Sequence, residues 1–589
     1  MRALGQVNEA KIAAPLAQAG LLGYEYADPT AVDVNDVAEI HQEPSLSCAD
    51  QRIHAGGEFN VAVADLESTC EIEQRHVADM TLRNPELCRH RADCTAKLWL
   101  SGAVTAGNGF RQSSTERCRD SIACMNYSTI LFRSSVITAA ILCTGIASAA
   151  TYEVRSIPDL QAAIDGALAG DTIIVHNGVY ATSASITVNR QGTADAPIRI
   201  VAKTIGGVEI TGTHGFNVVS PATHVEIRGF LFTHVSGRNQ IRSGATHIRF
   251  TQNFFESTGD GAYLVVAGHD AEIDRNEFRN KSTLGNMIDV RGTGSQIAQY
   301  VWIHHNYFHD FTSPGGNGAE TIRFGLSGLS LSNGYGLIEH NVFVRCTGEN
   351  ELISNKSSAN TYRYNTILDS PGGELTLRHG NECLVYGNYF RNSAGMRIFG
   401  DRHQIFSNYF EATTGINIGN GAGEVADGAA LTTHDRPDDV VITFNTLVNS
   451  TRNYFQTGRT NGLGATNTVF ANNIIQGGGA AASLSGPYTG GVWEGNIIWE
   501  TAGGGSMPPG TYDEVNPLLE ETANGVFRPQ AGSPAIDSAV GDYAAVTLDH
   551  DGQPRTAAKD RGADEVSSDV IVAELLTPGS ILRLIHDRR

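Results

Sequence analysis

A short motif that recurs ten times constrains the fold of this chain more than any other feature. Each copy is an Asn followed by two residues that are mostly apolar or aromatic. The ten asparagines are Asn253, Asn276, Asn306, Asn341, Asn365, Asn388, Asn408, Asn445, Asn473 and Asn496. Successive copies lie 23, 30, 35, 24, 23, 20, 37, 28 and 23 residues apart. We interpret the longer steps as the same repeat with inserted loops.

This period predicts a solenoid in which each repeat forms one coil. The segments between the asparagines are short, alternating and β-rich, and they lack the leucine consensus of leucine-rich repeats. We therefore predict an all-β fold, a single-stranded right-handed parallel β-helix. In such a fold the asparagines stack at one corner as a hydrogen-bonded ladder.

The two ends of the solenoid also have recognisable patterns. Leu160, Ala163, Ile164 and Leu168 recur at helical spacing just before the apolar run 172–175. An amphipathic helix at this point would cover the backbone groups that the first coil leaves open. We predict that the β-helix domain spans residues 150–565. The loop-rich stretch 549–565 ends this domain, and residues 566–589 form a C-terminal tail or cap.

A targeting signal lies inside the chain. From Met125 there is a short polar start, an apolar run over residues 136–147 and the small-residue pattern Ala147-Ser148-Ala149. This pattern is typical of a Sec signal peptide, and about 12 apolar residues are too few to span a bilayer comfortably. We expect residues 125–149 to be a signal peptide cleaved before Ala150. The protein should then be secreted or periplasmic, with no membrane attachment after cleavage.

The segment 1–124 precedes this signal and resembles nothing in the rest of the chain. It has no sustained periodicity and carries six cysteines, Cys48, Cys70, Cys88, Cys94, Cys118 and Cys124. We interpret it as a doubtful upstream extension, with Met125 as the biological start. A cysteine-rich prodomain is the alternative, although the cysteine spacing fits no zinc pattern.

The charge of the chain excludes one class of partner. The formal net charge is -21, the pI is about 5.3, and no extended Lys/Arg tract is present. These values argue against nucleic-acid binding. An anionic polymer could still bind, but only through a local cluster of Lys and Arg or through a bound metal ion.

Three segments about one coil apart carry the residues that are suited to chemistry. They are GGNGAETIRFG, GENELISNKSS and GGELTLRHGN. In a solenoid these segments stack on one face. Glu349 and Glu351 lie two apart, so on a strand they share a side and repel each other unless a cation lies between them. The alternative is a solvated strand edge where these acids pair with Lys356 and Arg378.

With these motifs the sequence resembles polysaccharide lyase family six, the β-helical alginate lyases and chondroitinase B. The parts NGAETIR, GENELISNKS and LTLRHGN carry the resemblance, which extends from about Tyr152 into the 560s. The resemblance implies that Asn317, Glu349 and Glu351 are calcium ligands. It also implies that Lys356 is the Brønsted base and that Arg378 is the Brønsted acid.

Two further residues match positions near the substrate in this family, His379 and Arg323. An ordinary exposed corner residue is the alternative for His379. One departure from the family is an apparent extra residue in SPGGELTLR, before Arg378. We expect Lys356 to point outward, so that its replacement by Ala would leave the fold intact.

The resemblance implies a secreted, calcium-dependent lyase that cleaves alginate, an anionic uronate polymer, by β-elimination to unsaturated oligosaccharides. Calcium takes oxygen ligands, and a cation beside the uronate carboxylate stabilises the charge that develops when C5 loses its proton. A neutral Lys356 would accept that proton, and Arg378 would stabilise or protonate the departing oxygen.

Several other functions remain open at this point. A chondroitin or dermatan sulfate lyase shares the site chemistry, and a mannuronan C5-epimerase shares the proton abstraction. A β-helical glycoside hydrolase would need paired acids without the lysine and arginine. The non-enzymatic alternative is a β-solenoid adhesin.

Overall fold

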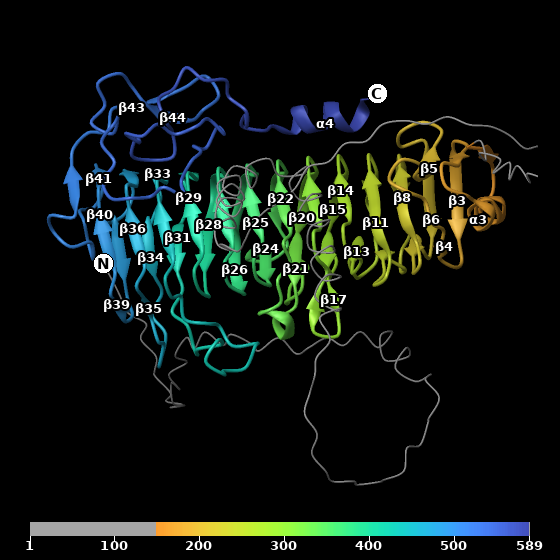
Figure 1. The fold of residues 1–589 in the computed structure, drawn as a ribbon, viewed down its shortest axis with the longest axis horizontal. Coiled ribbons are helices and arrows are strands. Elements are labelled where there is room, and N and C mark those ends of the chain that lie inside the picture. The colour runs from red at the N-terminus through yellow and green to blue at the C-terminus, as the bar shows by residue number, and fades with distance from the viewer. Residues whose placement is uncertain (1–148, 588–589) are drawn as a thin grey trace, which may run out of the picture. The chain divides into compact units, whose positions relative to one another are not determined.

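The computed structural model describes residues 149–587 of the chain. The segment 1–124 and nearly all of the expected signal peptide lie outside the described residues. Within 149–587, no helix is both long and apolar enough to cross a membrane. The described part is a parallel β-helix, which confirms the predicted fold class (Figure 1).

The coils stack three rows of parallel strands, and two of these rows join into one large sheet through β26 and β28. The first row contains β1 (Thr151–Val154), β2 (Thr172–Val175), β5 (Ile198–Ala202), β8 (Thr223–Arg228), β11 (Thr246–Thr251), β14 (Glu272–Asp274), β19 (Trp302–His304), β22 (Leu337–Glu339), β25 (Thr361–Arg363), β27 (Leu384–Tyr386), β29 (Gln404–Phe406), β32 (Val441–Thr443), β36 (Val469–Ala471) and β40 (Val492–Glu494).

The second row begins at the corner that carries the repeated asparagines. It contains β3 (Gly178–Thr182), β6 (Val208–Gly212), β9 (Phe230–Phe232), β12 (Phe254–Phe255), β15 (Glu277–Lys281), β20 (Tyr307–Thr312), β23 (Val342–Thr347), β26 (Thr366–His379), β28 (Tyr389–Ile398), β30 (Tyr409–Glu411), β33 (Thr446–Val448), β37 (Ile474–Gln476), β41 (Asn496–Trp499) and β42 (Tyr512–Glu514).

The third row shares the long strands β26 and β28 with the second. Its other members are β4 (Ile186–Val188), β7 (Phe216–Val218), β10 (Asn239–Ile241), β13 (Leu264–Val266), β16 (Ile288–Val290), β21 (Ile322–Gly325), β24 (Glu351–Lys356), β31 (Gly415–Ile418), β34 (Tyr454–Gln456) and β38 (Ala482–Leu484). Short additional elements in loops are β17 (Gly292–Thr293), β18 (Gln296–Ile297), η4 (Ser327–Leu329), β35 (Ala465–Thr466) and β39 (Tyr488–Thr489).

The ten repeated asparagines form the predicted ladder. Each one except the last, Asn496, donates a hydrogen bond from Nδ2 to Oδ1 of the next, over distances of 2.9–3.1 Å. The residue before each ladder Asn has a positive φ between 52° and 65°. Glycine fills this strained position twice, as Gly387 and Gly495. The ladder therefore fixes a sharp turn at the same corner of every coil from Asn253 to Asn496.

The interior of the coils is filled by stacked apolar side chains. Phe255, Phe278, Phe308 and Phe343 form one stack, with successive ring centroids 4.4, 4.8 and 4.8 Å apart. These rings are fully buried, as are the free thiols of Cys346 and Cys383. Because this stacked interior does not depend on the outer surface, the outward side chains are available for binding and chemistry.

The N-terminal cap is the helix α3 (Ile157–Gly166), which lies at one end of the coils (Figure 1). Its N-cap residue Ser156 accepts a hydrogen bond from the backbone N–H of Asp159, and Leu160 and Ile164 are buried. The predicted capping helix is thus confirmed. The assignment of Leu168 to its apolar face is wrong, because the helix ends at Gly166 and Leu168 is 56% exposed.

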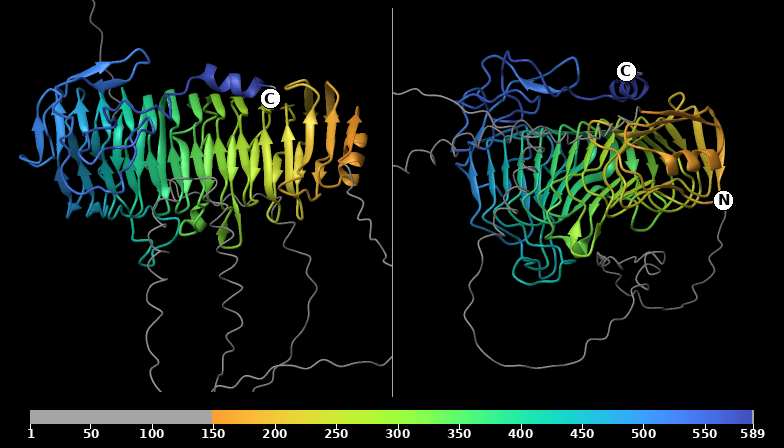
Figure 2. Two further views of the ribbon diagram at one scale, coloured as in Figure 1. Left: turned by 45° about the horizontal axis from the view of Figure 1, so that its top comes forward. Right: turned by 45° about the vertical axis from the view of Figure 1, so that its right-hand side comes forward.

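After β42 the chain turns back along the outside of the coils (Figures 1 and 2). This C-terminal segment, residues 515–587, contains the antiparallel pair β43 (Leu519–Glu521) and β44 (Phe527–Pro529) and the helix α4 (Pro578–His586). Helix α4 buries Ile581 and Ile585 against residues of the second row, among them Phe254 and Val342. It therefore covers a flank of the β-helix rather than its open end.

Candidate active site

The predicted site residues lie on neighbouring coils of the third row. Strand β24 pairs with β21 on one side and with β26 on the other, and β26 pairs with β28. The register aligns Arg323 with Ser354, Ser354 with Thr376, and Thr376 with Arg397. Because parallel neighbours in register point the same way, residues far apart in sequence share one surface. The three motifs therefore come together as the sequence predicts.

The centre of this surface is a group of three buried or half-buried carboxylates. One oxygen from each of Glu320, Glu349 and Glu351 lies within 4.8 Å of the others. Glu349 Oε2 accepts hydrogen bonds from the backbone N–H groups of Gly318 (2.7 Å) and Ala319 (3.0 Å). Burial raises the pKa of Glu349 to about 7, and the negative charge of Glu320 adds to the increase. Where these carboxylates are ionised, they repel one another.

Glu351 is the carboxylate that holds the positive side chains in place. Its Oε1 accepts from Arg378 Nη1 at 2.9 Å and from Arg397 Nη2 at 2.5 Å, while Ser354 Oγ donates to Oε2 at 2.5 Å. Burial alone would raise the pKa of Glu351, but Arg397, Arg378 and Lys356 together lower the pKa to about 2. Glu351 is therefore ionised at neutral pH and orients two guanidinium groups from successive coils.

Lys356 is buried rather than outward and solvated, so that expectation from the sequence is wrong. Its side chain is 2% exposed, and Nζ lies 3.3 Å from Glu320 Oε1. The other oxygen of Glu320 accepts from Asn286 Nδ2 at 2.7 Å. The neighbouring coil comes close because residue 325 is glycine with φ +102°, where a Cβ would lie 2.7 Å from the Lys356 carbonyl.

Arg378 and His379 follow each other at the end of β26. His379 is 1% exposed, both of its ring nitrogens lack a hydrogen-bond partner, and its ring stacks on His434 with centroids 5.5 Å apart. Burial, followed by the proximity of His434, lowers the pKa of His379 well below its usual value. The alternative of an exposed corner residue is therefore wrong. A neutral imidazole with unsatisfied nitrogens is suited to hydrogen-bond a substrate.

The remaining two candidates lie at the edge of this group. Arg323 donates from Nε and Nη2 to the two oxygens of Asp289, both at 2.9 Å, so its guanidinium is anchored to the preceding coil. Asn317 lies on an exposed loop, next to the two backbone N–H groups that bind Glu349. Its role as a metal ligand stays a prediction.

Sequence reasoning did not assign roles to three residues of this surface. Glu320 lies in the first motif, three residues after Asn317, but the pattern gave no reason to prefer it. Arg397 could have been found by continuing the register one coil beyond Thr376. His434 could not, because it comes from the inserted loop between β31 and β32, where it also packs against Phe399 (4.6 Å). An inserted loop has no repeat from which its position can be predicted.

The acidic group fits the metal that the sequence implies. Calcium is bound by carboxylate and amide oxygens, and Glu320, Glu349 and Glu351 offer such oxygens within a span that one ion can bridge. Burial, and after it the negative charge of Glu320, raises the pKa of Glu349. The residues present can therefore hold a hard divalent cation next to Lys356 and Arg378.

Comparisons with known proteins agree with this surface. A family model described as Chondroitinase B matches residues 154–475. Among curated proteins, none is similar enough to the chain to count as a match. The solved structure of the PL6 family alginate lyase AlyGC is similar with a TM-score of 0.59 and 26% identity, over 65% of this chain and 55% of AlyGC. The chain thus spans about half the length of that relative.

Two further solved structures share the fold. A mannuronic acid specific polysaccharide family 6 lyase from human gut microbiota has a TM-score of 0.53 and 26% identity, over 59% of this chain and 86% of that protein. The alginate lyase AlyF-OU02, solved with G6, has a TM-score of 0.53 and 20% identity, over 65% of this chain and 91% of that protein. At 20% identity, the last likeness concerns the fold alone.

Proposed function

Because the chain belongs to the chondroitinase B family of polysaccharide lyases, we propose that it cleaves alginate by calcium-dependent β-elimination. The observation that carries the proposal is the convergence of Lys356 and Arg378 on the three carboxylates of the candidate site. A glycoside hydrolase would need paired acids without these cations beside them. An adhesin would need no buried, unsatisfied histidine at this place.

The chain's own residues can carry each part of the reaction. Lys356, in its neutral form, accepts the proton from C5 of the uronate ring, and the electron pair of that C–H bond forms the C4–C5 double bond. The bond from C4 to the glycosidic oxygen breaks, and Arg378 donates a hydrogen bond to the departing oxygen. Arg378 is already oriented by Glu351, so little reorganisation is needed when charge develops.

We propose that Glu349, Glu351 and Glu320 hold calcium, with Asn317 as the further ligand that the family resemblance implies. When bound, calcium stabilises the charge that builds up on the uronate carboxylate as C5 loses its proton. Arg397 and Arg378 stay fixed by Glu351 beside the same carboxylates. His379, whose two ring nitrogens have no hydrogen-bond partner, offers them to sugar hydroxyls.

Alginate is the favoured substrate because the solved structures at 26% identity include a PL6 family alginate lyase and a mannuronic acid specific lyase. Incubation of the purified protein with alginate and with dermatan sulfate tests this choice. We expect alginate to give oligosaccharides with the ultraviolet absorbance of a new C4–C5 double bond. Elimination from dermatan sulfate alone would contradict the proposed substrate, and epimerised alginate without new double bonds would contradict the reaction.

We also propose that the enzyme is secreted or periplasmic and that its mature form begins near Ala150. This rests on the signal-peptide pattern at residues 125–149. Expression of the full chain in a Gram-negative host, followed by N-terminal mass spectrometry of the exported protein, is the test. Exported protein that retains peptides from residues 1–124 would contradict the proposal.

A further inference from the structure

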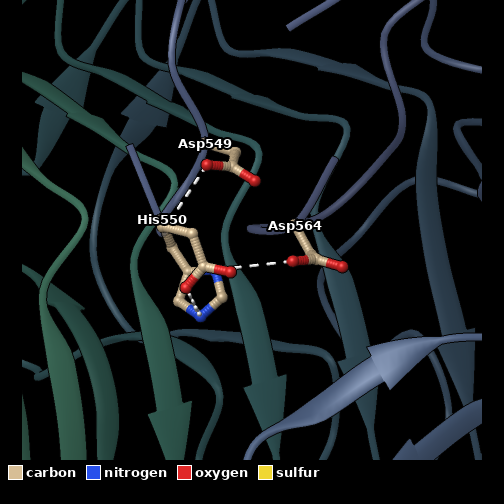
Figure 3. Close-up of side chains that lie close together, drawn as sticks. Asp549, His550 and Asp564 are labelled. Carbon is tan, nitrogen blue, oxygen red and sulfur yellow. Dashed lines mark hydrogen bonds and ion pairs between the residues drawn. The ribbon is translucent and has the colours of Figure 1, made fainter. Parts of the chain in front are cut away.

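A second buried acidic cluster lies in the C-terminal segment, far along the chain from the candidate active site (Figure 3). It consists of Asp549, His550, Asp551 and Asp564. One possible ligand atom from each lies within 4.8 Å of the others. All four are buried, with exposed fractions of 0, 7, 3 and 7%. Charged groups at this depth need compensation by an opposite charge or by hydrogen bonds.

The protein supplies only part of that compensation. Arg528 Nη1 lies 2.6 Å from Asp551 Oδ2 and also pairs with Asp564. The other nearby guanidinium, Arg555, is bound to Glu565 (3.3 Å) and to backbone carbonyls. Arg555 also acts on Asp549 and Asp564, so two arginines face four carboxylates, namely the three aspartates and Glu565. Two negative charges therefore remain. A divalent cation carries the charge that would balance them.

The backbone holds one of the three aspartates in place. Asp549 is oriented by the backbone N–H groups of Asp551, Gln553 and Glu565, which donate to its two oxygens. A carboxylate has about four lone-pair positions, so these bonds leave Asp549 able to bind a metal as well.

His550 is the independent sign of a ligand. The His550 side chain is buried, with 7% of its surface exposed, and its Nδ1 has no hydrogen-bond partner. This nitrogen lies 3.7 Å from Asp564 Oδ1. The His550 Nε2 lies 3.5 Å from Asp551 Oδ1. A buried polar atom without a partner costs free energy, unless something binds it. A neutral imidazole nitrogen that faces carboxylates is a common metal ligand.

A small pocket lies beside the cluster. A small pocket of about 10 Å³ between the coils and the C-terminal segment is lined by His550 and Asp551, together with Tyr364, Tyr389 and Glu574. This space is about the size of one water molecule, so a single bare ion or water fits beside the two ligands. The pocket walls belong both to the ladder corner of the β-helix and to the C-terminal segment, so an ion bound here would connect the two.

We propose that Asp549, His550, Asp551 and Asp564 form a second metal site that binds a divalent transition cation, Zn²⁺ in the first place. Mixed imidazole and carboxylate ligands suit Zn²⁺, whereas an all-oxygen group such as the candidate active site suits Ca²⁺. The role of this site is structural, because a bound ion would hold the loop 547–555 against the outside of the coils. One hydrogen bond already does so, since Ser407 Oγ donates to the Leu548 carbonyl.

Titration of Zn²⁺ into the chelator-treated full-length protein by calorimetry tests the site. We expect one strong Zn²⁺ per chain and a higher melting temperature in its presence. His550→Ala and Asp564→Asn should weaken Zn²⁺ binding by about tenfold or more. The matched control is Asp560→Asn, which removes a buried carboxylate of the same segment that binds only backbone N–H groups of Asp537 and Val566. It should lower stability but keep Zn²⁺ affinity.

Two further measurements keep the proposal testable even if a variant does not fold. X-ray absorption of the Zn²⁺-loaded wild-type protein should show one imidazole and oxygen ligands. Absence of strong Zn²⁺ binding, an imidazole-free site, or unchanged affinity in a folded His550→Ala variant would overturn the proposal. Ca²⁺ binding at the candidate active site should be unchanged in His550→Ala and weakened in Glu349→Gln, so failure of either site is recognised separately.

Discussion

The two buried acidic clusters of this molecule differ in what holds their carboxylates. At the candidate active site, Glu351 is surrounded by long cationic side chains from successive coils, Arg378 and Arg397. At the C-terminal cluster, Asp549 is fixed by three backbone N–H groups, and Arg528 is the bridging cation. Side-chain donors on a strand face can turn toward a substrate, whereas backbone donors in a loop cannot. The first arrangement suits turnover and the second suits structure.

The largest expected effect is the loss of the base at the first cluster. Lys356→Ala should reduce β-elimination by about 10³-fold or more, since no other group there can accept the C5 proton as well. Lys356→Arg should fail almost as badly, because a guanidinium stays protonated. The rate of double-bond formation is the measurement, with circular dichroism to confirm folding.

Burial of Lys356 requires a control for this variant. Its removal leaves Glu320 without its ammonium partner, so some loss of stability is expected together with the loss of rate. The double variant Lys356→Ala with Glu320→Gln should recover stability but not turnover. A folded Lys356→Ala protein with nearly the wild-type rate would show that another group abstracts the proton.

The next effect concerns the carboxylate that organises the site. Glu351→Gln removes a charged oxygen ligand and the anchor of Arg378 and Arg397, so we expect about 10²-fold slower turnover and a higher calcium requirement. Chelation of the wild-type protein should also remove most activity. Kinetics as a function of free calcium measure both effects.

A matched control exists one coil away. Glu374 is half-buried and lies 3.0 Å from Arg397, but it is not part of the acidic group. Glu374→Gln should therefore slow turnover much less and leave the calcium requirement unchanged. Full activity of the wild-type protein after exhaustive chelation would contradict the calcium assignment.

The sequence predicted the frame of the first cluster because the frame is periodic. The spacing of ten asparagines was sufficient for the β-helix and its ladder, since every coil repeats the same turn. The roles of Glu349, Glu351, Lys356 and Arg378 came from the resemblance to polysaccharide lyase family six, and the coil spacing predicted only that their motifs stack on one face. The burial of Lys356 could not be predicted, because it depends on Glu320 and Asn286 from two other coils.

The second cluster escaped prediction for the opposite reason. Arg528, Asp549 and Asp564 come from irregular segments, and Arg528 meets Asp564 across 36 residues without any repeat. The pattern at 549–565 indicated only a loop-rich end of the domain. Loops take their positions from specific hydrogen bonds, such as those of Arg555 to Gly562 and Ala563, and not from a period.

A smaller effect is expected from the inserted loop that covers the first cluster. His434→Ala removes the ring that stacks on His379 and Phe399, so His379 should be held less firmly. Because His434 touches no reacting group in the proposed mechanism, we expect KM to rise about three- to tenfold while kcat changes little. Steady-state kinetics on alginate separate the two constants.

The same loop offers the control for this variant. Thr432 lies two residues away and is exposed. Thr432→Ala should leave both constants unchanged. If His434→Ala lowered kcat by orders of magnitude with KM unchanged, His434 would be a catalytic residue and the assignment of roles at this site would be wrong.

The smallest effect on turnover, and the sharpest test of the comparison, is Arg528→Ala. Arg528 and Arg397 resemble each other because each forms ion pairs with two carboxylates. Arg528 pairs with Asp551 and Asp564, and Arg397 pairs with Glu351 and Glu374. If the first cluster serves turnover and the second serves structure, Arg397→Ala should slow the reaction, whereas Arg528→Ala should keep the rate within about twofold well below the unfolding temperature.

Breaking a buried pair costs about 3 kcal/mol or more, so Arg528→Ala should melt at a lower temperature. The three aspartates then carry one more uncompensated charge, so Zn²⁺ should bind more tightly and restore more stability than in the wild type. Thermal melts with and without Zn²⁺, beside elimination rates, measure both properties. A large loss of rate in folded Arg528→Ala would mean that the two clusters are coupled, and the division between turnover and structure would not hold.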